Sequence, residues 1–385
     1  MFSRAKKTPI VEWWWTVDKE LLTALALLLA VGMILSFAAS PPVAERLGLS
    51  PWHFVIRHAF FASAAFFLLV GVSFLDARQV KLLSLALLAG SIFLLIIAWQ
   101  FGIEIKGSRR WVKILGQSVQ PSEFVKPVFA VIAAWLFAQK MKHPDMPARL
   151  IATGLMVLIA TLFMLQPDFG QTVLLVATWA FLLFLTGISW WITFGLLGMA
   201  AVGALAAYIF MPNVARRIDG FLNPENVDTY QIDRALQSLL EGGWFGRGPG
   251  EAIVRRYVPD AHADFVFSAA AGEFGILFAM VLVALIAFVT LRSLFLAQRQ
   301  SSLFVRLAIS ALAIQFGLQA GINLTVNLNM APATGMTLPF VSYGGTSMLA
   351  TAFSLGFILA LARRKPEETL ASGIPPYKSV MVPGE

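Results

Sequence analysis

LLTALALLLAVGMILSFAAS, residues 21–40, is a continuous run of twenty residues without one charged side chain. A helix rises 1.5 Å per residue, so a run of this length crosses the ~30 Å hydrocarbon core of a bilayer. Comparable runs follow at roughly 55–75, 81–101, 121–140, 149–165, 171–188, 191–211, 265–290, 302–326 and 345–362. The sequence therefore predicts an all-α, polytopic integral membrane protein of about ten transmembrane helices.

The composition agrees with a membrane protein and excludes several other classes. The chain is 58% hydrophobic and 13% charged, whereas a soluble domain averages ~45 to 50% apolar and ~25% charged residues. It contains no cysteine, which excludes disulfides, thiolate metal sites and a cysteine nucleophile. The net charge of +8 sits in short clusters between apolar runs, so we expect no nucleic-acid partner.

The basic clusters also predict the orientation, because short cytoplasmic connections hold an excess of lysine and arginine. They fall on one face of the predicted bundle, together with the N-terminal segment: Arg78 and Lys81; Lys140, Lys142 and Arg149; Arg292, Arg299 and Arg306; Arg363, Arg364 and Lys365. We expect a cytoplasmic segment at 1–20, a transmembrane domain at 21–364 and a cytoplasmic, disordered tail at 365–385. Both termini are then cytoplasmic.

Two segments on the opposite face carry positive charge where this rule does not expect it. One contains Lys106, Arg109, Arg110 and Lys113, and the other is a large extracytoplasmic loop at about 212–263, between helices 7 and 8. The basic residues of that loop are all arginine: Arg216, Arg217, Arg234, Arg247, Arg255 and Arg256. Long loops translocate regardless of charge, but arginine forks also bind phosphate oxygens. The two explanations remain open.

Several polar residues lie inside or beside the apolar runs. Glu123 and Lys126 are three residues apart at a helix start, where they can pair or serve a site. Four amides recur every four residues and predict hydrogen bonds between helices: Gln315, Gln319, Asn323 and Asn327. The proline- and glycine-rich stretch 329–347 then predicts a re-entrant or cavity-lining loop.

Asp264, in PDAHADFVF (259–267), stands at the outer start of the eighth predicted helix. An aspartate there can be a simple N-cap, although His262 and Asp260 beside it keep a functional role open. The glycine-rich GGWFGRGPG (242–250) lacks the Gly-Lys-Ser/Thr ending of a P-loop, so we predict a mobile segment or a close backbone approach and not a nucleotide site.

These motifs together resemble the SEDS family of shape, elongation, division and sporulation proteins. The resemblance runs from the first helix to about Arg364 and rests on motifs in a fixed order: KGSRRWVKILGQSVQPSEFVKP (106–127), QPDFGQT (166–172), RRIDGFLNP (216–224), GGWFGRGPG (242–250), PDAHADFVF (259–267) and GMTLPFVSYGGTS (335–347). Thr337 in the last motif is similar to the division branch, since the rod-elongation branch usually has a proline there.

The resemblance implies a peptidoglycan glycosyltransferase that polymerises lipid II, the undecaprenyl-diphosphate-linked disaccharide peptide. It implies the bacterial cytoplasmic (inner) membrane at the division septum, a class B penicillin-binding transpeptidase partner and other divisome membrane proteins. The family's catalytic aspartate corresponds to Asp264. Its basic and polar binding positions correspond to Arg110, Glu123, Lys126, Arg217, Arg247, His262 and Ser342. One departure is Gly272, where the family usually carries the first of two glutamates.

The chemistry implied by this resemblance needs one base, because an α-linked diphosphate gives a β-linked product in a single inversion. Asp264 would take the proton of the acceptor hydroxyl, and Arg110, Lys126 and the loop arginines would stabilise the departing diphosphate. A divalent cation could share that task, but we see no ligand cluster for a metal. Two other classes stay open: a flippase or transporter of the lipid-linked precursor, and a non-catalytic divisome scaffold.

Overall fold

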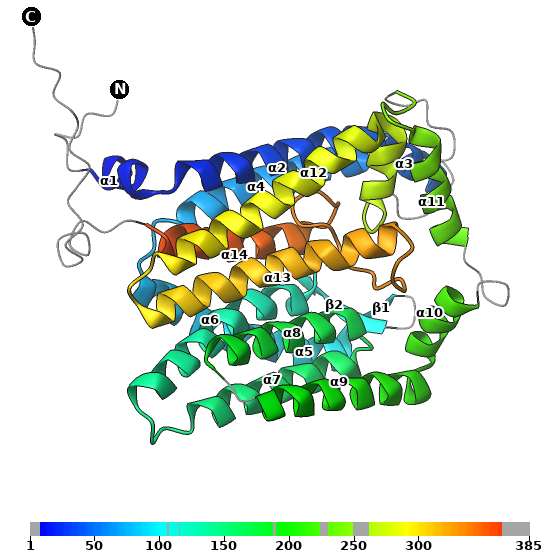
Figure 1. Cartoon of the computed structure of the whole chain (residues 1–385). Helices are drawn as coiled ribbons and strands as arrows, with labels where there is room; N and C mark the ends of the chain where they lie inside the picture. The colour runs from blue at the N-terminus through cyan, green and yellow to red at the C-terminus, as the bar shows by residue number, and fades with distance from the viewer. Residues whose placement is uncertain are drawn as a thin grey trace, which may run out of the picture.

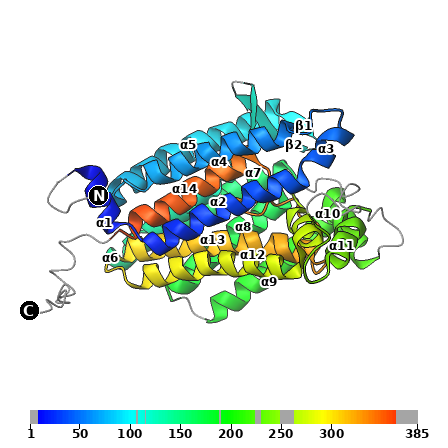
Figure 2. The same cartoon turned by 90° about the horizontal axis from the view of Figure 1, so that it is seen from above.

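The computed structural model describes residues 8–105, 108–114, 116–187, 190–223, 230–248 and 262–363. Its helices are α1 (Pro9–Thr16), α2 (Lys19–Ala39), α3 (Pro41–Arg46), α4 (His53–Val72), α5 (Ala77–Phe101), α6 (Pro121–Lys142), α7 (Ala148–Leu165), α8 (Phe169–Leu185), α9 (Trp190–Phe210), α10 (Pro212–Leu222), α11 (Tyr230–Gly242), α12 (Val266–Gln298), α13 (Leu303–Asn327) and α14 (Gly345–Leu361). The long helices lie side by side along one common direction (Figures 1 and 2). The prediction of an all-α, multi-pass membrane protein is confirmed.

The number of spans differs from the predicted ten. Within the described residues, seven helices are long and apolar enough to cross a membrane, and an eighth results if the bent pair α9 and α10 counts as one span. The remaining two predicted runs form α8 and α14, which have 17 residues each. This length is the lower limit for crossing the hydrocarbon core, so hydropathy located these helices but overestimated how many reach full length.

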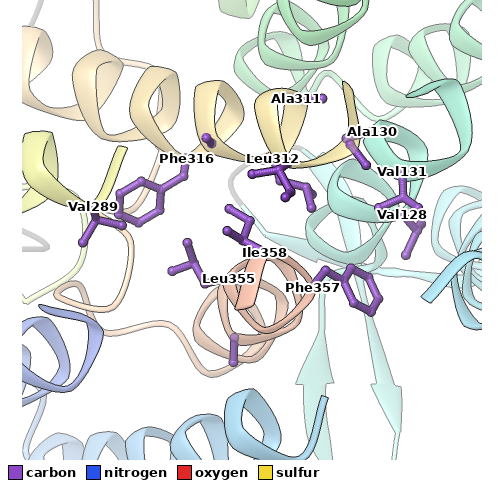
Figure 3. Packing of buried hydrophobic residues seen from close by; sticks show 14 of the residues in the cluster. Val128, Ala130, Val131, Val289, Ala311, Leu312, Phe316, Leu355, Phe357 and Ile358 are labelled. Carbon is purple, nitrogen blue, oxygen red and sulfur yellow. The ribbon is translucent and has the colours of Figure 1, made fainter. Parts of the chain in front are cut away.

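Helices α6, α13 and α14 form the centre of the bundle. Their buried faces are rich in alanine and other small residues, which let helix backbones approach closely in a membrane. Figure 3 shows Val128, Leu312 and Ile358, one from each helix, within this core. The outer helices contact the centre in turn, with α4 against α14, α5 against α6 and α12 against α13. A buried central layer of this kind can hold polar side chains away from lipid.

A small antiparallel sheet was not predicted. Its strands are β1 (Ile103–Ile105), β2 (Ser108–Ile114) and β3 (Gln117–Val119), in the order β1-β2-β3. β2 contacts α5 and α6, so the basic segment after α5 is folded onto the end of the bundle. The sheet, α10 and α11 lie at the end of the bundle opposite α1, the first described helix (Figure 1). We call this the loop end, and the other the terminal end.

The large loop predicted at about 212–263 contains two amphipathic helices, α10 and α11. Arg255, Arg256 and Asp260 lie outside the described residues, as do Lys106 and the tail 365–385. Next to the loop, α12 bends at Gly275, whose φ of 85° is a left-handed value that glycine adopts readily. The bend separates a short buried segment at the loop end from the long apolar part of α12.

Candidate functional site

Asp264 lies in the turn before α12 and is half-buried. Its main-chain carbonyl accepts hydrogen bonds from the side-chain amides of Asn323 and Asn327, both at 2.9 Å. Asn327 Oδ1 also accepts from the backbone N–H of Ser268, at 3.1 Å. The amide stripe of α13 therefore makes the predicted hydrogen bonds between elements, and two of its members fix the backbone that carries Asp264.

The same stripe holds the loop between α13 and α14 against Asp264. Asn323 Nδ2 donates to the carbonyl of Met336 at 2.7 Å, and Gln319 Nε2 donates to the carbonyl of Thr337 at 3.2 Å. Gly335 has a φ of 71°, and the Oδ2 atom of Asp264 is 3.9 Å from the place where a Cβ on Gly335 would stand. The predicted cavity-lining loop thus brings its backbone next to the carboxylate.

Arg110 projects from β2 toward the connection between α7 and α8. Its Nη1 lies 3.2 Å from Oδ1 of Asp168, and its Nε donates to the carbonyl of Gln166 at 2.9 Å. Asp168 Oδ2 accepts from Gln120 Nε2 at 3.2 Å. Burial raises the pKa of Asp168, while the charge of Arg110 opposes this shift. The ion pair is nearly closed to solvent, with side-chain exposures of 18% and 5%.

Asp168 lies in the quoted motif QPDFGQT, but no pattern in the sequence marks it as a site residue. Its partner Arg110 is far away in sequence, and neither hydropathy nor spacing reports such a contact. The absence of lysine and arginine from this short connection was the available signal, because an acid there has no local partner.

Arg217 on α10 interacts with both parts of the site, the turn that carries Asp264 and the Arg110–Asp168 pair. Its Nη1 donates to the carbonyl of Ala333 at 3.0 Å. Loss of hydration lowers the pKa of Arg217 and Arg110 lowers it further, whereas Asp264 and Asp168 raise it. Arg217 therefore interacts electrostatically with the other three charged groups, and it stays protonated because an arginine does not lose its proton in proteins. Arg110, Arg217, Asp168 and Asp264 form what we call the charged cluster.

Glu123 and Lys126 form a buried ion pair beside this cluster. Lys126 Nζ lies 2.9 Å from Glu123 Oε2 and also donates to Gln319 Oε1 at 3.2 Å. Gln171 Nε2 donates to the other oxygen of Glu123 at 2.7 Å. The pair was one of the two alternatives that the spacing allowed. Its charges also act on Asp168, which couples α6 to the charged cluster.

The other predicted site residues lie around these groups. The ring of His262 stacks on Phe54 at a centroid distance of 4.6 Å, and its carbonyl accepts from the backbone N–H of Tyr343 at 2.8 Å. Ser342 is buried, and its Oγ accepts from the backbone N–H of Leu338 at 2.8 Å. His262 and Ser342 therefore shape the turn and the loop next to Asp264.

Arg247 lies on a different side of the Asp264 segment. Its Nε donates to the carbonyl of Glu241 at 2.9 Å, and its backbone N–H donates to the carbonyl of Gly272 at 3.1 Å. Within the described residues, these bonds connect Arg247 to α11 and α12 and not to the charged cluster. The predicted set therefore does not come together as one group.

Gly272, the departure from the family pattern, lies where α11 contacts α12. A Cβ at this position would stand 2.5 Å from Ser238 Oγ and 2.9 Å from the Ser238 carbonyl oxygen. A Cβ on Gly242 would stand 2.0 Å from the carbonyl oxygen of Ala271. Residues 242–248 also bond to the backbone of α12 around its bend, as when Ile276 N donates to Gly243 O at 2.9 Å. The close backbone approach, one of the two predicted alternatives, is therefore present at residues 242–248, and Gly272 is part of it.

Comparison with known proteins places the chain in a family. The family model for the FtsW, RodA and SpoVE cell cycle proteins matches residues 19–367. Among curated relatives, proteins named "Probable peptidoglycan glycosyltransferase FtsW" are similar over most of both chains. The one from Caulobacter vibrioides is 42% identical over 97% of this chain and 96% of its own length, and the one from Dichelobacter nodosus is 34% identical over 89% of each.

Solved structures agree. A chain from a peptidoglycan synthase complex that coordinates polymerization and crosslinking has a TM-score of 0.76 and 27% identity, over 91% of this chain and 98% of that one. The rod shape determining protein RodA of Thermus thermophilus has a TM-score of 0.67 and 27% identity, over 91% and 97%. The chain therefore belongs to the SEDS family of FtsW, RodA and SpoVE proteins.

Proposed function

We propose that this protein is a peptidoglycan glycosyltransferase that polymerises lipid II during cell division, with Asp264 as its general base. The observation that carries the proposal is the setting of Asp264 at the loop end. Two asparagines hold its backbone, and Arg217 lies within its electrostatic reach. The family membership and the names of the relatives support the same activity.

The reaction needs one proton transfer and one inversion. The acceptor sugar hydroxyl attacks the anomeric carbon of the donor sugar as the bond from that carbon to the diphosphate oxygen breaks. The diphosphate leaves with the electron pair, and Asp264 takes the proton of the attacking hydroxyl. General-base catalysis of this kind contributes roughly 10² to 10⁴ in rate. A half-buried carboxylate on a fixed backbone suits that role, because reorientation would cost part of the effect.

The chain supplies cations for the departing diphosphate. Arg110 and Arg217 belong to the charged cluster, and Lys126 lies next to it, so negative charge that develops there meets preorganised positive groups. The residues that the structure describes contain no group of three or more His, Cys, Asp or Glu arranged to hold a metal ion. We assign stabilisation of the diphosphate to Arg110, Arg217 and Lys126 because of their positive charge and their place in or next to the charged cluster. Arg247 and the remaining loop arginines are further candidates for binding the lipid-linked substrate.

The comparisons also support a partner and a location. One similar chain belongs to a complex that couples polymerization to crosslinking, and we propose that this protein works with a class B penicillin-binding transpeptidase. We place the loop end outside the bacterial inner membrane at the septum. Both termini are then cytoplasmic, because the terminal end carries the basic clusters.

The test is polymerisation of labelled lipid II by the purified full chain in complex with its transpeptidase. Asp264→Asn should abolish polymer while the complex stays intact. Asp219→Asn is the matched control, because Asp219 is also a carboxylate of the loop end but accepts from Tyr208 Oη at 2.9 Å. This control should keep nearly full activity.

Other results would favour the alternative functions. Full polymerisation by Asp264→Asn would remove the base assignment. No polymer from the wild-type complex would favour a scaffold, or a precursor flippase if labelled lipid II crossed the bilayer of proteoliposomes.

A further inference from the structure

A basic groove lies at the terminal end, remote from the charged cluster. It has a volume of about 210 Å³ and lies between the start of α5, the end of α6 and the start of α13. Three of its lining side chains are cations, Arg78 and Lys81 from α5 and Lys142 from α6, and Trp135, Ser302 and Phe304 also line it. Two helices, α5 and α6, thus bring three like charges around one open space, which disfavours the groove unless an anion enters it.

No carboxylate lines the groove among the described residues. Asp76 and Asp145 are the acids nearest in sequence. Asp76 is the N-cap of α5 and accepts from the backbone N–H of Gln79 at 2.8 Å, and Asp145 is exposed. Neither acid forms an ion pair with Arg78, Lys81 or Lys142 in the part of the chain that the structure describes. The positive charge of the groove therefore remains available to a ligand.

The remaining lining residues suit the interface between water and lipid. Lys81 Nζ lies 5.1 Å from the centroid of the Trp135 ring, and tryptophan is enriched at the level of lipid headgroups. Ser302 is the residue before α13 and makes no side-chain capping bond. The N-terminus of α13 therefore adds a positive dipole end to the three cations.

An excess of basic residues at this end alone would satisfy the positive-inside rule. That rule does not require the basic side chains to line a groove or to gather around a tryptophan. Lys140, Arg299 and Arg306 belong to the same end and satisfy it without lining the groove. We propose that the basic groove binds the phosphate headgroup of an anionic phospholipid from the leaflet at the terminal end. Headgroup sites of this kind occur in basic pockets between transmembrane helices.

The proposal can be tested by titrating the purified full chain with phosphatidylglycerol and measuring bound lipid by native mass spectrometry. Each juxtamembrane cation contributes roughly a fivefold factor to the affinity for anionic lipid. The triple variant Arg78→Gln, Lys81→Gln, Lys142→Gln should therefore bind phosphatidylglycerol more than tenfold more weakly. Lys142→Gln alone should bind phosphatidylglycerol about fivefold more weakly. Because Lys142 is exposed, this single variant should fold even if the chain does not tolerate the changes at Arg78 and Lys81.

The matched control is the triple variant Lys140→Gln, Arg299→Gln, Arg306→Gln, which removes the same charge from the same end and should keep the affinity. Equal weakening in both triples would mean that only the diffuse charge attracts lipid, and would overturn the proposal. Unchanged binding by the groove triple, or equally tight binding of zwitterionic phosphatidylcholine, would overturn it as well. Displacement of the lipid by millimolar glycerol phosphate would assign the groove to a soluble phosphate compound and not to a lipid.

Discussion

The guanidinium of Arg110 lies 3.2 Å from the carboxylate of Asp168 in an ion pair nearly closed to solvent. The neighbouring Arg109 pairs with Glu104 at 3.3 Å on the same small sheet, but those side chains are 52% and 57% exposed. The adjacent arginines of β2 thus form one buried pair and one exposed pair of the same chemistry. Only the Arg110–Asp168 pair lies in the charged cluster. Variants of the two pairs can therefore separate the effect of the cluster on stability from that of exposed charge.

Arg110→Gln should destabilise the protein and do so more at higher pH. Burial holds the pKa of Asp168 above its unfolded value, and Arg110 opposes that shift. The folded state therefore binds a proton at Asp168 more tightly than the unfolded state does. The associated stability is complete below the unfolded pKa of about 3.9 and is lost as the pH rises through the folded value. Without Arg110, the loss of stability with rising pH should be larger. It should approach the ~3 to 5 kcal/mol that removal of one member of a buried ion pair costs.

Thermal unfolding of the detergent-solubilised protein at pH 5 and pH 8 measures this. The drop in unfolding temperature between the two values should be larger for Arg110→Gln than for the wild type. Arg109→Gln should match the wild type at both values, because an exposed pair contributes about 0 to 1 kcal/mol. Equal behaviour of the two variants would mean that the buried pair does not govern stability.

Lys126→Met should leave Glu123 as a buried charge that retains only the bond from Gln171. Removal of one member of such a pair costs about 3 to 5 kcal/mol, whereas replacement of both members by neutral groups is often nearly neutral. The double variant Glu123→Gln, Lys126→Met should therefore unfold at a higher temperature than Lys126→Met alone. A double-mutant cycle on unfolding temperature and on polymerisation separates the structural role of the pair from its role in the reaction. Additive effects would contradict a direct interaction.

Asn323→Ala and Asn327→Ala should each lower the turnover of lipid II by about 10- to 100-fold, because a small misplacement of a catalytic group has effects of this size. The side-chain amides of both asparagines donate to the main-chain carbonyl of Asp264, so we expect them to act through the position of this residue. We therefore expect a fall in kcat with little change in KM. Steady-state polymerisation kinetics report this split. A rise in KM alone would mean that they act on substrate binding instead.

Gln315→Leu is the control from the same helix face. Its Nε2 is buried and has no hydrogen-bond partner among the described residues, so its removal leaves no broken bond. The variant should keep kcat and should be as stable as the wild type or more stable, because a buried amide hydrogen without a partner costs free energy.

Hydropathy and local spacing predicted much of the fold and part of the site. They located the long helices, because lipid imposes a length and an apolar composition on any span. The Glu123–Lys126 pair and the amide stripe of α13 were also visible, since residues three or four apart share a helix face. Asp264, by contrast, acquired its assignment only through the resemblance to a family, because an aspartate before a helix has a common structural role.

Contacts between distant segments could not be predicted. Nothing local joins Arg110 to Asp168 or Gly272 to Ser238, which depend on how β2, α8, α11 and α12 pack. The sheet was missed as well, because its strands are short and its alternating residues form part of a charged segment. The bend at Gly275 was hidden in a continuous apolar run, where hydropathy does not distinguish a straight helix from a bent one.

Gly272→Glu introduces the residue that the resemblance to the family implies at this position, and it should nevertheless impair this chain. Its Cβ would meet the Ser238 carbonyl oxygen at 2.9 Å, an atom of the α11 backbone that cannot rotate away. The helices α11 and α12 would have to separate, which would disturb the bend and the segment that leads to Asp264. We expect both a lower unfolding temperature and a lower rate of polymerisation. Gly321→Ala on α13 is the control, because nothing lies within 4 Å of its new Cβ, and this change should stabilise the helix by up to about 1 kcal/mol. A Gly272→Glu protein as stable and active as the wild type would show that α11 can move away from α12 without consequence for the site.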